Sequence, residues 1–114
     1  MRILDGEQVL VRIFVGESDR WRHQPLSSAL LERLRREGFA GATVYQGVAG
    51  FGARSVLHSA HLLRLSEDLP VVIEIVESEE KINAFLPVLD GMMGSGLVTL
   101  EKVRVLQYGK NGKA

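Results

Sequence analysis

Apolar and polar residues alternate strictly near the start of the chain. Valine or isoleucine occupies every second position of residues 9–15, which predicts a strand over residues 8–15 with one apolar face. The run 71–77 is almost continuously β-branched, as in a central strand that is covered on both faces. Residues 97–106 carry valine or leucine at intervals and are expected to form the last strand.

Two other segments place apolar residues at helical spacing. Leucines form a stripe along residues 26–37, with Pro25 in the first turn and Gly38 as the expected C-cap. A second helix is predicted after Ser78, which is a good N-cap followed by two acidic residues in the first turn. Its interior Pro87 is expected to kink it.

Five of the twelve glycines lie in the run 38–52, GFAGATVYQGVAGFG. Its β-branched and aromatic residues predict a strand over residues 41–48, with Gly47 as a bulge and a Gly-Phe-Gly turn at its end. The next residues, 53–66, fit either a helix or a strand. We favour a mobile loop followed by a strand.

The predicted order of elements is β-α-β-β-α-β, which is the ferredoxin-like pattern. We therefore expect an α+β sandwich in which an antiparallel four-stranded sheet carries two helices on one face. A chain of 114 residues is expected to form a single domain that buries about two thirds of its unfolded surface. Its core would cover residues 8–106, and the polar residues 107–114 would form a flexible tail.

Composition limits the classes of function. Fourteen basic and fourteen acidic side chains give no net charge, and with a pI near 6.8 the chain lacks the positive field typical of nucleic-acid-binding proteins. The absence of cysteine excludes disulfides, thiolate metal sites and a cysteine nucleophile. The first residues lack a signal-peptide pattern and no apolar run is long enough to span a membrane, so we expect a soluble cytoplasmic protein.

The Gly50-Phe51-Gly52 turn is the first candidate for ligand binding. Successive backbone amides in a turn can bind an anion, and Arg54 follows directly. A tight turn that only ends a strand fits the same spacing, because the phosphate-loop pattern G-x-x-x-x-G-K-[ST] is absent.

Three basic residues on predicted strands could also meet an anion. Lys102 and Arg104 lie on the last strand, whereas Arg12 lies on the first, facing away from the core side. A charge in that position needs a partner, either a phosphate or a carboxylate. We favour a salt bridge from Arg12 to Glu74 or Glu101.

Metal binding and catalysis have little support in the sequence. His58 and His61 are three residues apart, but no carboxylate or thiolate is spaced to complete a metal site. A loop histidine near a ligand, or a solvated one, explains His58 better. No nucleophile elbow and no pair of carboxylates for acid–base chemistry can be assigned, so we do not expect an enzyme.

The glycine run and its neighbours carry a family resemblance. The segment Gly41-Ala42-Thr43-Val44, followed by Gly50-Phe51-Gly52, resembles the G-x-T-V and G-F-G pattern of the nitrogen-signalling PII proteins. The longer strings GFAGATV, GVAGFGA and LSEDLPVV are similar to an uncharacterised family of PII-like proteins, a domain of unknown function. The resemblance covers residues 8–106, nearly the whole chain.

The resemblance implies an assembly, a ligand and a partner. A homotrimer is implied, with an adenine nucleotide such as ATP, ADP or AMP bound in the clefts between subunits. The loop after the second strand, residues 53–63, would contact a partner protein, for example a membrane transporter or channel. Gly41 and the Gly50–Gly52 turn match PII positions beside the nucleotide, and Gly94-Ser95-Gly96 lies where PII proteins have the glycine loop that cradles phosphates.

The chain also departs from the PII pattern. Leu97 stands where a PII lysine follows the glycine loop, the tail YGKNGKA lacks the PII arginine pair, and the loop has no tyrosine to be nucleotidylated. The full set of predicted ligand-binding residues is Arg12, Gly41, Gly50, Phe51, Gly52, Arg54, His58, Gly94, Gly96, Lys102 and Arg104.

The favoured hypothesis is a trimeric regulator that senses an adenine nucleotide or a similar anionic metabolite. Two alternatives stay open. One is a structural or assembly module whose glycines only shape strands and subunit contacts. The other is a trimeric metal-tolerance-like protein, which would depend on His58 and His61.

Overall fold

The computed structural model describes residues 4–51 and 68–106. It confirms the predicted α+β class, with two helices and a four-stranded antiparallel sheet, and adds one short hairpin. The elements in chain order are β1 (Gly6–Gly16), β2 (Arg20–Trp21), β3 (Gln24–Pro25), α1 (Leu26–Arg36), β4 (Thr43–Gln46), β5 (Pro70–Glu77), α2 (Glu79–Met92) and β6 (Leu97–Val105).

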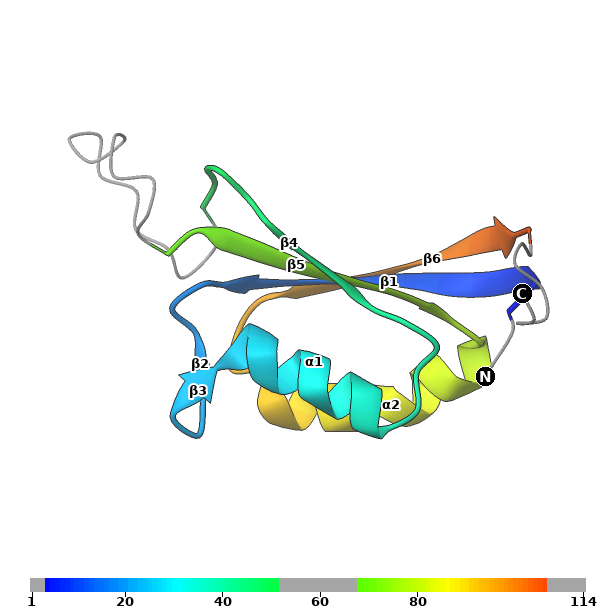
Figure 1. Cartoon of the computed structure of the whole chain (residues 1–114), viewed down its shortest axis with the longest axis horizontal. Coiled ribbons are helices and arrows are strands. Elements are labelled where there is room, and N and C mark those ends of the chain that lie inside the picture. Colours follow the sequence, from blue (N-terminus) through cyan, green and yellow to red (C-terminus); the bar gives the residue numbers. More distant parts are fainter. Residues whose placement is uncertain (1–3, 52–67, 107–114) are drawn as a thin grey trace.

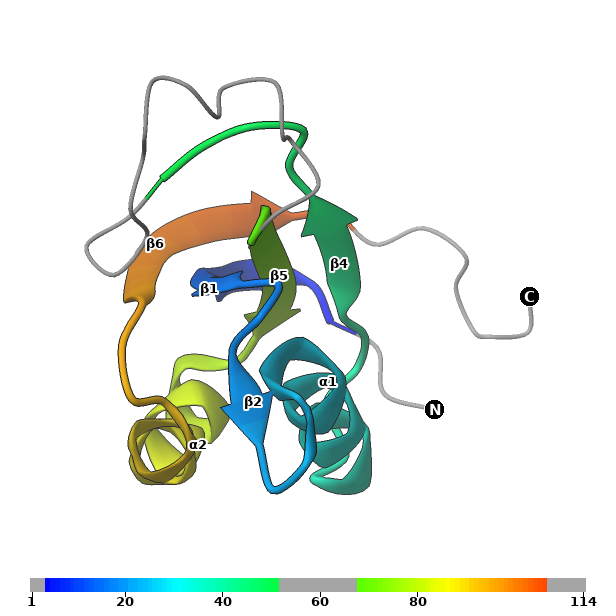
Figure 2. The same ribbon diagram turned by 90° about the vertical axis from the view of Figure 1, so that its left-hand side faces the viewer.

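The sheet has the strand order β4-β5-β1-β6, with every neighbouring pair antiparallel. Both helices lie on one face, and no helix of the described residues covers the opposite face of the sheet (Figures 1 and 2). β1 and β5 are the central strands, and their registers place Arg12 opposite Glu74 and Ile13 opposite Ile73. β4 and β6 are the two edge strands.

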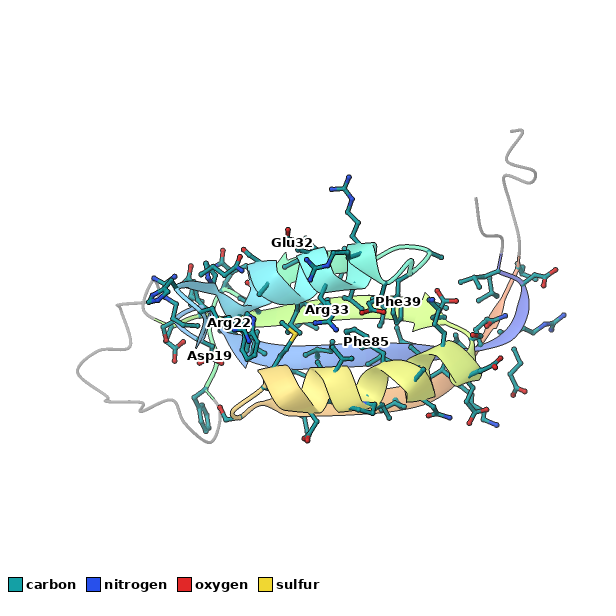
Figure 3. The ribbon with its side chains drawn as sticks, turned by 90° about the horizontal axis from the view of Figure 1, so that it is seen from below. Asp19, Arg22, Glu32, Arg33, Phe39 and Phe85 are labelled. Carbon is teal, nitrogen blue, oxygen red and sulfur yellow. The ribbon has the colours of Figure 1, made fainter. Side chains whose placement is uncertain are left out.

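The core lies between the sheet and the helices. In β1 and β5 the alternate residues from Val9 to Val15 and from Val71 to Ile75 are buried, as the period of two predicts. The apolar stripes of α1 and α2 pack against them, with Leu30 and Ile82 among the most deeply buried side chains. Phe39 and Phe85 meet edge to face between the two helices, with ring centroids 5.1 Å apart (Figure 3).

The start of α2 follows the sequence signals, whereas the two ends of α1 each differ by one residue from their expected positions. The Ser78 hydroxyl accepts a hydrogen bond from the Lys81 N–H at 3.2 Å, which caps α2 as expected. α2 then continues through Pro87 to Met92. α1 ends at Arg36 with Glu37 as its C-cap, not Gly38 as expected. Gly38 is the next residue and has a φ of +82°, the left-handed conformation that follows many helices. Pro25 occupies the N-cap position of α1, one residue before the first turn.

The β2–β3 hairpin was not predicted. Its turn residues Arg22 and His23 have φ values of +48° and +72°, a conformation in which a hairpin usually carries glycine or asparagine. The Arg22 guanidinium lies 4.8 Å from the centre of the Trp21 ring, and Trp21 itself packs against the core. The sequence has no glycine or asparagine at these two turn positions to indicate a hairpin. The observed turn instead goes together with the packing of Trp21 against the core.

The expected strand over residues 41–48 is shorter in the structure. Gly47 lies just beyond β4 and forms no bulge within it, since β4 pairs with β5 in unbroken register from Thr43 to Gln46. The Gly47 N–H donates to the Pro70 carbonyl at 2.7 Å, and a Cβ at Gly47 would lie 2.7 Å from Pro70 Cγ. Close packing on Pro70 thus accounts for the glycine.

Some expectations cannot be compared with the structure. The predicted loop and strand within residues 53–66 and the tail 107–114 lie outside the described residues. In the described part of the chain, neither helix is long and apolar enough to cross a membrane.

Candidate ligand site

The predicted ligand-binding residues are spread over the sheet. Gly50 packs on Pro70, beside the β4 edge, and Gly96 packs on the Phe14 carbonyl, beside the β6 edge. Both lie at the end of the sheet where β1 finishes, but three strand spacings, about 14 Å, separate the two edges. Gly41 precedes β4, towards the opposite end. A single chain therefore does not bring these glycines together.

Gly96 has a structural explanation that needs no ligand. Its φ is +125°, and a Cβ built on it would lie 2.6 Å from both the Phe14 carbonyl oxygen and the Met93 methyl carbon. Any other residue would have to move the carbonyl of a central strand. The glycine at this position is required for β6 to leave α2 and align with β1.

Gly41 and Gly94 have no such explanation. Apart from the adjacent residues of the chain, no heavy atom of the described residues lies within 4 Å of the position that a Cβ would take at either residue, and neither has a φ in the left-handed region. A side chain would fit at both positions. Each of these glycines instead opens onto a surface depression, which leaves room for a ligand or another subunit.

Gly94 lines a hollow between α2 and the start of β6, which we call the α2–β6 hollow. Its volume is about 430 Å³, within the range of small-molecule sites. It is lined by Leu86, Leu89, Asp90, Met93, Gly94, Ser95, Gly96 and Val98. Asp90 is the only ionisable group that the described residues contribute to this lining, so none of them supplies a basic side chain for a phosphate here.

Gly41 lines a second depression, the α1–β4 groove, of about 540 Å³. It is formed by Ser28, Leu31, Glu32, Leu34, Arg35, Phe39, Ala40, Gly41 and Ala42. Glu32 lies on the side of α1 that faces away from α2 (Figure 3). Arg35 makes no ion pair with the described residues, so this groove offers a cation for an anionic group.

A buried carboxylate fixes one wall of the α1–β4 groove. Glu77 is completely buried at the end of β5, and its Oε1 accepts the Ala40 N–H at 3.0 Å. Its Oε2 accepts the Ser78 N–H at 3.3 Å. These bonds tie the segment before Gly41 to the start of α2, and both backbone N–H groups donate to the buried carboxylate.

Arg12 forms the predicted salt bridge, with both candidate partners at once. Its Nε–H donates to Glu74 at 2.9 Å and its Nη1–H donates to Glu101 at 3.0 Å. These hydrogen bonds raise the pKa of the guanidinium. The three side chains lie on the face of the sheet without helices, where Arg12 is already paired with two carboxylates. Contact between Arg12 and a ligand stays a prediction.

Lys102 and Arg104 lie on the other face of β6, because they pair across from Val9 and Glu7. Both are exposed. Six residues of extended strand, about 20 Å, separate Lys102 from Gly96. Neither the Lys102 nor the Arg104 side chain can reach a phosphate at the Gly94–Gly96 loop of its own chain.

The sheet face without helices is rich in apolar side chains. Around the Arg12 ion pairs, β1 contributes Leu10 and Phe14, and β5 contributes Val72 and Val76. β6 adds Leu97, which is 55% exposed. An apolar face of this kind is typical of protein–protein contacts. We call it the open sheet face.

Several predicted residues cannot be placed. Gly52, Arg54, His58 and His61, with the partner-binding loop 53–63, lie outside the described residues. Phe51 is described and is 72% exposed beside the Gly50 turn. Within residues 4–51 and 68–106, no three histidine or acidic side chains are grouped so as to hold a metal ion.

Sequence reasoning missed Asp90 and the α1–β4 groove. Asp90 lies four residues, about one helical turn, before Gly94. This spacing could have indicated that the two residues lie on the same side of the molecule. The groove has no comparable signal, because its lining comes from α1 and from the turn after it.

Comparison with known sequences identifies related proteins. The profile of the DUF190 family, described as Uncharacterized ACR, matches residues 8–105. A UPF0166 protein of Aquifex aeolicus is 40% identical over 106 residues, which cover 93% of this chain and 98% of that protein. A UPF0166 protein of Methanocaldococcus jannaschii is 37% identical over 97 residues, covering 84% of this chain and 89% of that protein.

Solved structures share the fold. A candidate PII-like signaling protein from Thermus thermophilus superimposes with a TM-score of 0.61 at 23% identity, covering 93% of this chain and 94% of that one. The PII-like protein CPII from Thiomonas intermedia, solved with bound ADP, AMP and acetate, gives a TM-score of 0.56 at 16% identity and covers 92% of both chains. At these identities the similarity shows the fold.

Proposed function

Because this chain belongs to the DUF190 family and has the fold of PII-like proteins, we propose that it is a regulatory protein that binds an adenine nucleotide or a similar anionic metabolite. The ADP and AMP bound by CPII, a protein of the same fold, carry this proposal. The unfilled spaces at Gly41 and Gly94 support it, since both glycines open onto depressions large enough for part of a nucleotide.

The proposed assembly is a homotrimer with ligands in the clefts between subunits. The open sheet face supports this, because other copies of the chain would cover its apolar residues. Assembly would also explain why Gly41 and Gly94 lie far apart in one chain, since a neighbouring copy can bring the two depressions together. Residues 53–63 would then contact a partner protein, such as a transporter or channel, and no reaction would be catalysed.

We expect Val72→Lys to convert the assembly to monomers. Val72 is half-buried on the open sheet face, and a lysine there would place a charge in the proposed subunit contact. Light scattering coupled to size exclusion should show a trimer mass for the native protein and a monomer mass for the variant. Ala84→Lys, on the exposed side of α2, is the matched control and should stay trimeric. A native protein of monomer mass would contradict the proposed assembly.

Nucleotide binding is tested directly by calorimetry with AMP, ADP and ATP. We expect heat at submillimolar concentration for at least one of them, and at least tenfold weaker binding after Gly94→Leu, because the leucine fills the α2–β6 hollow. Gly91→Leu is the control, since Gly91 also has open space around it but does not line the hollow. No heat with any of the three nucleotides at millimolar concentration would favour the structural or assembly module instead.

A further inference from the structure

The lining of the α2–β6 hollow indicates which part of a ligand it can hold. Four of its side chains are apolar: Leu86, Leu89, Met93 and Val98. The single charge is the Asp90 carboxylate, which accepts hydrogen bonds but cannot donate them when ionised. A phosphate here would face a negative charge without a basic partner from the same lining, which is unfavourable.

A flat, largely apolar group with a hydrogen-bond donor fits this lining better. Among the parts of an adenine nucleotide, the base meets that description, because its faces are apolar and its 6-amino group donates hydrogen bonds. Carboxylates accept from the exocyclic amino groups of bases in nucleic-acid recognition, with the same donor–acceptor chemistry. Because Gly94 has no side chain, the part of the hollow that it lines stays open for such a ring.

The basic side chains that the structure describes do not line the α2–β6 hollow, which agrees with a base rather than a phosphate in it. Arg35 lines the α1–β4 groove, while Lys102 lies about 20 Å along β6 from Gly96. Arg12 is already bonded to two carboxylates. Within residues 4–51 and 68–106, the α2–β6 hollow therefore has no cation in its lining to meet the negative end of a nucleotide.

We propose that the α2–β6 hollow binds the 6-aminopurine base of the nucleotide, with the Asp90 carboxylate accepting a hydrogen bond from the amino group. The inference rests on the proposed function and assigns the base of the adenine nucleotide to this hollow. It also makes Asp90 the residue that selects this base.

The test is a thermodynamic cycle between Asp90 and the amino group, measured by calorimetry on the full-length protein. The ligands are AMP and purine riboside 5′-monophosphate, which carries hydrogen in place of the amino group. The native protein should bind AMP about tenfold more tightly than purine riboside 5′-monophosphate, since a hydrogen bond to an exposed carboxylate contributes about that factor to the affinity. Asp90→Ala should bind both ligands equally.

The control variant is Glu80→Ala, which removes an exposed carboxylate from the first turn of the same helix and should retain the tenfold preference. If AMP binds but Asp90→Ala keeps that preference, the assignment of Asp90 is wrong while the proposed function stands. If the native protein binds no adenine nucleotide, the proposed function fails and this inference fails with it.

Discussion

Gly96→Ala is expected to destabilise the protein by about 2–5 kcal/mol. The alanine would adopt a left-handed conformation, which costs about 1–2 kcal/mol, and its Cβ would lie 2.6 Å from the Phe14 carbonyl oxygen. Relieving that overlap shifts a central strand, and overpacking of this kind costs about 1–3 kcal/mol. Urea denaturation followed by circular dichroism should show a clearly lower midpoint with an unchanged slope.

Gly94→Ala is the matched control for this prediction. It lies two residues away in the same loop, and its added methyl group meets nothing within 4 Å. We expect a change within about 0.5 kcal/mol of the native stability. Equal losses in the two variants would contradict the assignment of Gly96 to structure and Gly94 to ligand binding.

The second large effect is expected for Glu77→Ala, which should cost about 2–4 kcal/mol. The substitution removes the acceptor of the Ala40 N–H and leaves a cavity where a fully buried side chain was. The segment before Gly41 would lose its bond to the end of β5. The free energy of unfolding from urea titration measures the loss.

Glu77→Gln distinguishes the two contributions. The glutamine keeps the length of the side chain and one acceptor oxygen, so most of the Ala40 bond and of the packing is retained. We expect a smaller loss than for alanine. Glu79→Ala, an exposed neighbour in the first turn of α2, should be close to neutral. A Glu77→Ala variant as stable as the native protein would show that the carboxylate does not hold this segment.

The regular parts of the fold could be predicted because their signals are local. The alternation of residues 9–15 specifies the buried face of β1, and Ser78 with its acidic neighbours specifies the start of α2. One local prediction was wrong and one element was missed, both for non-local reasons. Gly47 was expected to form a bulge but packs on Pro70, and the β2–β3 hairpin has a turn without glycine, with Trp21 packed against the core.

The candidate site was less predictable than the fold. Glycines were predicted as ligand-binding residues because they allow other atoms to come close to the backbone. The sequence does not show whether those atoms belong to a ligand or to another part of the chain. The structure shows that Phe14 approaches Gly96 and Pro70 approaches Gly50, while Gly41 and Gly94 remain open. Asp90 was overlooked since an aspartate on an exposed helix face is ordinary until the fold places a hollow beside it.

The position of β1 in the middle of the sheet has a consequence for biosynthesis. β1 is the first strand of the described chain, yet it pairs with β5 on one side and with β6, the last strand, on the other, so that Gly6 lies opposite Val105. Contacts this distant in sequence slow the search for the native state. All of the chain from β1 to β6 must leave the ribosome before the sheet can close, and until then an emerging β1 exposes both of its edges to other nascent chains.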